Sequence, residues 1–453
     1  MSEFFGSIWW LIVSLSLLVT FHEFGHYWVA RRCGVRVLRF SVGFGRPLLT
    51  RRNRAGTEFV IAAIPLGGYV KMLDEREGPV HPADLPYAFN RKNIWQRIAI
   101  VAAGPGANLL LCVCLLWAMF VIGRQDYAPV IGHVAGIAAE DGFKPGERIL
   151  QVGDRNVATW GDAIMAMAPA ALDRQDIQIQ TRNQYGQQFV RTLSLSQLPQ
   201  GFAETQIDRE AGFTWQFMVS PPLIDSVQPN SAADGVLQPG DLILAIDGQR
   251  VSSADQVAPL VQILGESGEA ALIDIERDGK RLALDIRPRH SEQPRSGEAA
   301  WALGIVLGTG QRPGYDAVQR YGPLAAIPAA FRETGKLTSD TLGMIRRMIT
   351  GQASIKNISG PVTIARVANA SVKRGPDWFI YFLALVSLSL AIINLMPIPI
   401  LDGGHLLYYL IELVKGSPLS ERATIAGQYI GLALLAGLMG LAFYNDILNL
   451  IPR

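Results

Sequence analysis

Four long apolar stretches constrain this chain more than any other feature of its sequence. They cover about residues 4–30, 98–123, 378–395 and 425–448. A helix of about 20 apolar residues is long enough to cross the hydrocarbon core of a bilayer. The stretches therefore predict a polytopic α-helical membrane protein with four transmembrane helices. The first is interpreted as a retained span, because only Glu3 precedes it and no basic start or small-residue cleavage site marks a signal peptide.

Basic residues indicate how the spans are oriented. Arginine and lysine are concentrated between the first two apolar stretches, with Arg51, Arg52 and Arg54 close together. The positive-inside rule places this segment in the cytoplasm. The N-terminus and the region between the second and third spans are then expected outside, and the loop with Lys415 and Arg422 inside.

Composition argues against a nucleic-acid-binding protein and against a disulfide-bonded one. The formal net charge of +2 is too small to indicate a nucleic acid partner. The cysteines are Cys33, Cys112 and Cys114, an odd number with two in an apolar run, which argues against a disulfide framework. We expect them to be buried thiols.

The cytoplasmic segment 36–96 has the pattern of a membrane-associated β-hairpin. Alternating apolar residues, a basic turn and β-branched positions run through residues 36–75. The apolar, Gly-rich "PLGGYV" at 65–70 suggests that this sheet dips into the membrane face, which requires protein or water to satisfy its backbone. A hairpin remote from any active site is the alternative.

An internal repeat occupies the outer region. Residues 134–157 and 227–251 both show small residues, then Pro-Gly, an acidic residue, a strand and a turn. The pattern resembles tandem PDZ domains, although Glu147 stands where Asp is usual in the first copy. A PDZ groove takes an extended peptide or chain end; the alternative is that these domains only exclude bulky substrates. Residues 321–370 indicate an amphipathic helix, either on the outer membrane face or under the second PDZ domain.

A metal-binding motif ends the first span. In a helix, His22 and His26 lie on one face, where both imidazoles can bind one Zn²⁺. Glu23 then stands beside the metal as a general base, as in the HExxH signature of zinc hydrolases. Ionisable residues inside a membrane are costly and functional by default, so the motif predicts a zinc site.

A catalytic zinc site usually takes three protein ligands and a water. The stretch "NLMPIPILDGGHLL" at 394–407 supplies Asp402, and its prolines and glycines break the helix around that residue. Asp402 is the expected third ligand. His405 is the competing one, more readily interpreted as a residue that supports the ligands.

These motifs together resemble the site-2 protease family of intramembrane zinc metalloproteases. "FHEFGH" at 21–26, "GPGAN" at 104–108, PDZ-like repeats outside and "NLMPIPILDGG" at 394–404 occur in the same order over essentially the whole chain. The resemblance implies one zinc per chain bound by His22, His26 and Asp402, with Glu23 as base and acid.

The same resemblance implies further roles. Asn394, Gly104, Asn108 and Pro397 are expected near the substrate. Asn394 is open to the alternative of a helix-capping or interhelical hydrogen bond, and Gly104 and Asn108 to that of close helix packing. The expected substrates are a transmembrane anti-sigma factor trimmed by a first protease, and remnant signal peptides, cut in envelope stress signalling.

The location implied is the bacterial inner membrane, with PDZ domains periplasmic and the active site toward the cytoplasm. Membrane lipid and peptide C-termini at the PDZ grooves are the other expected partners.

A transmembrane substrate hides its carbonyls in helical hydrogen bonds. We hypothesise that it unwinds and adds to a strand edge at 36–44 or 59–63.

A non-catalytic PDZ scaffold and a metal transporter are the rival functions. The expected parts are 1–35 (first span with HExxH), 36–96 (hairpin region), 97–123 (second span), 124–221 and 222–310 (PDZ domains), 311–377 (amphipathic segment), 378–410 (third span with LDG), 411–424 (cytoplasmic loop) and 425–453 (fourth span and tail).

Overall fold

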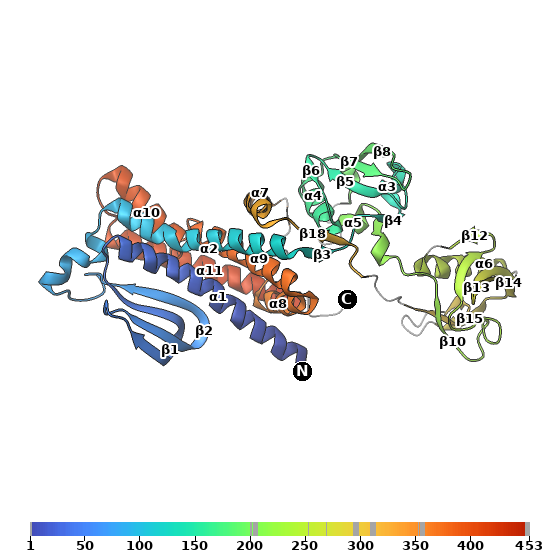
Figure 1. Cartoon of the computed structure of the whole chain (residues 1–453), viewed down its shortest axis with the longest axis horizontal. Coiled ribbons are helices and arrows are strands. Elements are labelled where there is room, and N and C mark those ends of the chain that lie inside the picture. The colour runs from blue at the N-terminus through green and yellow to red at the C-terminus, as the bar shows by residue number, and fades with distance from the viewer. Residues whose placement is uncertain are drawn as a thin grey trace. The chain divides into compact units, whose positions relative to one another are not determined.

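The computed structural model describes residues 2–199, 202, 207–251, 253–268, 270–292, 299–308, 314–351, 353 and 358–448. The chain divides into two compact units (Figure 1). The first combines Met1–Arg124 with Gln319–Arg453, and the second is Gln125–Val318.

Among the described residues of the first unit, four helices are long and apolar enough to span a membrane, as predicted. They are α1 Ser2–Arg32, α2 Ile94–Ile122, α9 Pro376–Leu395 and α11 Glu421–Leu448. α2 begins before its apolar stretch because Asn93 and Gln96 form a reciprocal capping box there.

The third span is shorter than the expected segment 378–410. α9 ends at Leu395, and a separate helix, α10 Asp402–Lys415, follows. Pro397 and Pro399 lie between them, and proline cannot donate to a helical hydrogen bond. The break lets Asp402 begin a new helix.

The hairpin segment forms two long strands, β1 Val37–Arg52 and β2 Glu58–Met72. Both bend at register shifts, so residues 37–42 lie opposite both 68–72 and 58–61, while 47–52 lies opposite 58–62. Within the predicted edges 36–44 and 59–63, residues 39–42 and 59–61 are therefore paired on both sides, and the prediction that these segments offer an edge is wrong. Within the described chain, the pairing leaves 47–52 and 68–72 at the two edges.

The amphipathic segment forms α7 Pro323–Ile349 and α8 Pro361–Arg374. α7 packs its buried alanines, Ala326, Ala329 and Ala330, against α2 and α9. α8 packs against α1, α9 and α11, and Asp446 of α11 accepts hydrogen bonds from the Gly360 and Val362 N–H groups at its start. The apolar faces of both helices thus cover the spans.

The second unit contains two sheets with the same strand order. In the first sheet the order is β6-β5-β7-β8 and in the second β12-β11-β13-β14. A helix lies between the second and third strands of each in sequence, α4 Trp160–Leu172 and α6 Val257–Ser267. The two copies of the repeat therefore fold alike, each around its own apolar core. The strands are β5 Arg148–Val152, β6 Arg155–Asn156, β7 Ile177–Arg182, β8 Gln188–Leu193, β11 Leu242–Ile246, β12 Gln249–Arg250, β13 Ala271–Arg277 and β14 Lys280–Ile286.

Shorter elements complete this part of the chain. They are β3 Arg124–Asp126, β4 Ile131–Val134, β9 Phe213–Trp215, β10 Ile224–Val227, β15 Arg289–Glu292, β16 Ala299–Ala302, β17 Ile305–Leu307, β18 Ala317–Gln319, α3 Gly136–Glu140 and α5 Ile207–Glu210.

The acidic residue after Pro-Gly has the same role in both copies. Glu147 accepts two hydrogen bonds from Arg191, and Asp241 accepts two from Arg277. Burial alone would raise the pKa of Asp241, but the Arg277 guanidinium and the Gln238 N–H together outweigh burial and hold this pKa below its ordinary value. Glu147 is thus a working substitute for the usual Asp.

Candidate metal centre

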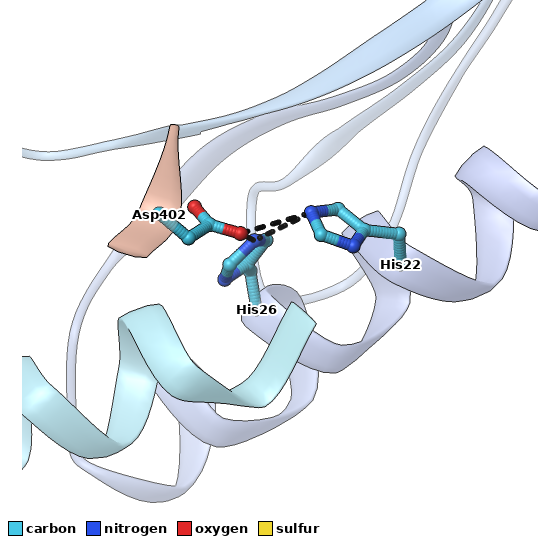
Figure 2. A group of neighbouring side chains, drawn as sticks. All are labelled: His22, His26 and Asp402. Carbon is cyan, nitrogen blue, oxygen red and sulfur yellow. Dashed lines mark hydrogen bonds and ion pairs between the residues drawn. The ribbon is translucent and has the colours of Figure 1, made fainter. Parts of the chain in front are cut away.

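One helix and one helix start supply the predicted ligands. His22 and His26 project from one face of α1, as their spacing predicts, and Asp402 approaches from the start of α10 (Figure 2). The loop before Asp402 is held in an unusual conformation, because Ile400 has a φ of 99°, a region that β-branched residues rarely adopt. Such backbone persists only where the surrounding structure holds it.

The three side chains converge on one point. Asp402 Oδ2 lies 3.1 Å from His22 Nε2 and 3.4 Å from His26 Nε2, and the two Nε2 atoms are 3.3 Å apart. Asp402 Oδ2 is buried without a well-oriented hydrogen-bond partner in the described structure. Two imidazole nitrogens and one carboxylate oxygen are a ligand set of catalytic zinc sites, so the arrangement fits zinc.

α2 supports both imidazoles from behind. His26 Nδ1 lies 2.8 Å from the Ile100 carbonyl oxygen, so Nδ1–H donates to that oxygen and the Nε2 lone pair faces the centre. On the other imidazole, His22 Nδ1 is 3.4 Å from Asn108 Nδ2, while Asn108 Oδ1 is buried without a partner. The oxygen and nitrogen of an amide are assigned from the hydrogen-bond network. With these two atoms of Asn108 exchanged, Oδ1 accepts a hydrogen bond from His22 Nδ1–H. Both histidines then present Nε2 to the centre.

Glycines allow the helices to approach this closely. A Cβ on Gly104 would lie 2.2 Å from His26 Nε2 and 2.8 Å from His22 Nε2. A Cβ on Gly25 would lie 2.2 Å from the Ala103 carbonyl oxygen. Gly104 therefore borders the ligands themselves, and Gly25 sets the distance between α1 and α2.

The predicted base lines a cavity beside the ligands. Glu23 borders a cavity of about 840 Å³ together with His22, His26, Asp402, Asn394 and His405. β2 reaches the same cavity, where a Cβ on Gly68 would lie 3.2 Å from Glu23 Cγ. The hairpin is thus part of the site, and the alternative of a remote hairpin is wrong.

The remaining predicted residues have different positions. Asn394 lines the cavity, and its amide donates to the Leu390 carbonyl of its own helix. Asn108 is fully buried behind His22. Pro397 is exposed in the break between α9 and α10 and is not among the cavity-lining residues. His405 lines the cavity outside the group of converging ligand atoms.

Ile100, Gly25 and Gly68 were not predicted. Ile100 acts through its carbonyl, which every residue carries, so no sequence signal marked it. Gly25 and Gly68 stand inside recognised motifs, and glycine there was a signal of close backbone approach.

Comparisons with known proteins agree with this chemistry. The model of peptidase family M50 matches residues 10–438. A relative from Xylella fastidiosa (strain 9a5c), provisionally named a zinc metalloprotease, is 60% identical over 99% of this chain and 100% of its own length. The regulator of sigma-E protease RseP of Escherichia coli (strain K12) is 41% identical over 97% of this chain and 98% of its own length. The order of motifs in this chain resembles that of the bacterial regulator-of-sigma-E protease.

A solved structure also matches part of the chain. It is the PDZ domain of the SdrC-like protein Lmo2051 from Listeria monocytogenes, 25% identical over 19% of this chain and 84% of its own, with a TM-score of 0.16. A TM-score this low says nothing of the fold of the second unit, Gln125–Val318, which follows from its own strand order.

Proposed function

The chain belongs to peptidase family M50 and is a zinc metalloprotease, and from this premise we propose that it hydrolyses peptide bonds within transmembrane segments of single-span membrane proteins. The observation that carries the proposal is the convergence of His22, His26 and Asp402 at the end of an apolar span, beside Glu23 and a cavity. A soluble protease has no need of a site built on spans.

Each residue of the site has a separate task. His22, His26 and Asp402 would hold one zinc, which when bound acidifies a water and polarises the scissile carbonyl. Glu23 accepts the proton of the attacking water and returns it to the leaving nitrogen. Asn394, which lines the cavity, contacts the substrate backbone. Gly104 leaves space for the ligands, and Asn108 orients His22.

The free edge of β2 presents the substrate. Residues 68–72 pair with 37–42 on one side, and Gly68, Tyr69 and Val70 line the cavity. A substrate helix must unwind before its carbonyl can be attacked, and the unwound segment can then add to this edge as a further strand. The edge stands beside Glu23, so added backbone would reach the site.

Proline tests this edge. Successive N–H groups alternate sides of a strand, so one of Tyr69→Pro and Val70→Pro removes an N–H from the free side only. The variant that removes only the free-side N–H should fold better than the other. We expect it to slow cleavage of a helix-stable substrate more than cleavage of a substrate with helix-breaking residues. At the other edge, whichever of Leu49→Pro and Thr50→Pro removes an N–H from the free side only is the control. Equal slowing of both substrates, measured by product yield over time, contradicts the edge.

The outer unit selects substrates by size, as tandem PDZ domains outside the membrane. A substrate with a large outer domain would collide with it, so the natural substrates are chains already trimmed, such as an anti-sigma factor or a remnant signal peptide. The name of the Escherichia coli relative, a regulator of sigma-E protease, supports this class. Peptide C-termini could also occupy the PDZ grooves.

Deleting residues 127–309 tests the size filter. The deleted residues lie inside the second compact unit. We expect the shortened protein to cut full-length substrate that the intact protein rejects, in an assay that scores product on a gel. Both proteins should cut a pre-trimmed substrate equally. Continued rejection of the full-length substrate, with the trimmed one still cut, defeats the filter.

The inner membrane of a bacterium is the expected location. The four spans and the RseP relatives support it. The positive-inside rule applied to the arginines between α1 and α2 supports a periplasmic N-terminus and outer unit. The site, at the end of α1 near those arginines, then opens toward the cytoplasm.

Reconstitution with chelator is the direct test of the function. We expect the purified protein in vesicles to cut a single-span substrate within its transmembrane segment, with the cut mapped by mass. A zinc chelator should abolish cleavage, and added zinc should restore it. A cut outside the span, or cleavage that survives complete removal of zinc, contradicts the proposal.

A further inference from the structure

Asp402 is the only ligand of the converging group that does not lie on α1. It begins α10 after an irregular break, whereas the histidines lie within a continuous helix. Something must therefore hold α10 at a defined distance from the histidines. The contact between α10 and α2 is where such a device is found (Figure 1).

Arg97 and Glu412 join these two helices. Arg97 stands in the first turn of α2, and its Nη2 and Nη1 donate to Glu412 Oε1 and Oε2 at 2.6 and 3.2 Å. The two side chains are only 13% and 18% exposed. A bidentate guanidinium–carboxylate pair fixes orientation as well as distance, and this one joins residues 315 positions apart.

A second contact comes from the same arginine. The Arg97 guanidinium lies over the ring of Tyr409, 4.9 Å from its centroid, and Tyr409 is buried on α10. Tyr409 and Glu412 are one turn apart, so Arg97 contacts α10 at successive turns. A helix rises about 1.5 Å per residue, so these contacts grip α10 within roughly 10–15 Å of Asp402 and limit its rotation and sliding.

One face of α2 thus contacts His22, His26 and the helix that carries Asp402. Arg97, Ile100, Gly104 and Asn108 are spaced by three, four and four residues, which aligns them along a helix. Ile100 supports His26, and Asn108 supports His22. Arg97 adds the link to the helix of Asp402.

We infer that Arg97 and Glu412 are positioning residues that hold Asp402 within ligand range of His22 and His26. This inference rests on the proposed zinc centre. Both side chains line the cavity, but neither is among the converging ligand atoms. Their loss should weaken metal binding by roughly 10–100-fold, as for other residues that support metal ligands.

Zinc affinity of the purified full-length protein, measured by competition with a chromophoric chelator, tests the pair. We expect Arg97→Met and Glu412→Gln each to weaken zinc binding by roughly 10–100-fold. The double variant leaves no unpaired charge. Its loss of zinc affinity should be no larger than that of the more affected single variant, because the two residues act as one unit. Excess zinc should restore much of the cleavage activity. If a single variant fails to purify, the double variant decides.

Two controls separate the possible failures. Arg39→Met breaks a comparable but more exposed ion pair to Glu58 on the hairpin and should leave zinc affinity unchanged. Asp402→Ala removes the ligand itself. If Asp402→Ala binds zinc normally, the proposed zinc centre is wrong. If Asp402→Ala weakens binding while the Arg97 and Glu412 variants, including the double variant, bind like wild type, the positioning role alone is overturned. Additive losses in the double variant also overturn it.

Discussion

Replacing Glu23 with glutamine abolishes peptide-bond hydrolysis while zinc stays bound: this is the largest effect that we expect from a single substitution. Glu23 borders the cavity beside the ligands but is not one of the three converging groups. An amide cannot accept the proton of the attacking water, and general base catalysis contributes roughly 10²–10⁴-fold. Initial rates on a single-span substrate and zinc content per chain measure the two halves of the expectation.

Glu23→Asp provides the conservative comparison, because it keeps the carboxylate and moves it back by one methylene. Its activity should fall between those of wild type and Glu23→Gln. Normal cleavage by Glu23→Gln would remove the base from the mechanism. Normal cleavage by a His22→Ala variant would favour the non-catalytic scaffold, and zinc movement across vesicles that survives in Glu23→Gln would favour the transporter.

The second large effect is expected from adding one methyl group at Gly104. The new Cβ would lie 2.2 Å from His26 Nε2 and 2.8 Å from His22 Nε2, well inside van der Waals contact. Both imidazoles are tied through Nδ1 to α2, so they cannot move without losing those supports. We expect Gly104→Ala to weaken both zinc binding and cleavage by roughly 10–100-fold or more.

Gly106→Ala is the matched control, because it lies on the same helix and its Cβ would meet nothing within 4 Å. Alanine is the better helix former at both positions, so both variants should fold. Zinc titration and thermal unfolding distinguish a local effect from a general one. Wild-type zinc affinity in Gly104→Ala would mean that the imidazoles have more room than the structure gives them.

The predictions that succeeded from sequence were those that depend on local pattern. Hydropathy over about 20 residues identified the four spans. The i, i+4 spacing was enough to place His22 and His26 on one face of the first span. Asp402 was the expected third ligand and His405 the competing one, and the structure brings the Asp402 carboxylate to the histidines.

The errors arose where strands pair. Residues 36–44 or 59–63 were expected to offer an edge, but the bends in β1 and β2 place these segments inside the sheet and leave 68–72 as the edge at the cavity. Side-chain alternation is the same for edge and interior strands, so the sequence could not distinguish them.

By itself, the sequence determined the four candidate spans, the internal repeat and the chemical types of the candidate ligands, because hydropathy, helical spacing and ligand type are properties of neighbouring residues. Only the tertiary structure decided which strand edge faces the cavity and how α2 supports the ligands. It alone showed that Arg97 meets Glu412. These contacts join residues far apart in the chain, and they form only when the buried faces of several helices pack together.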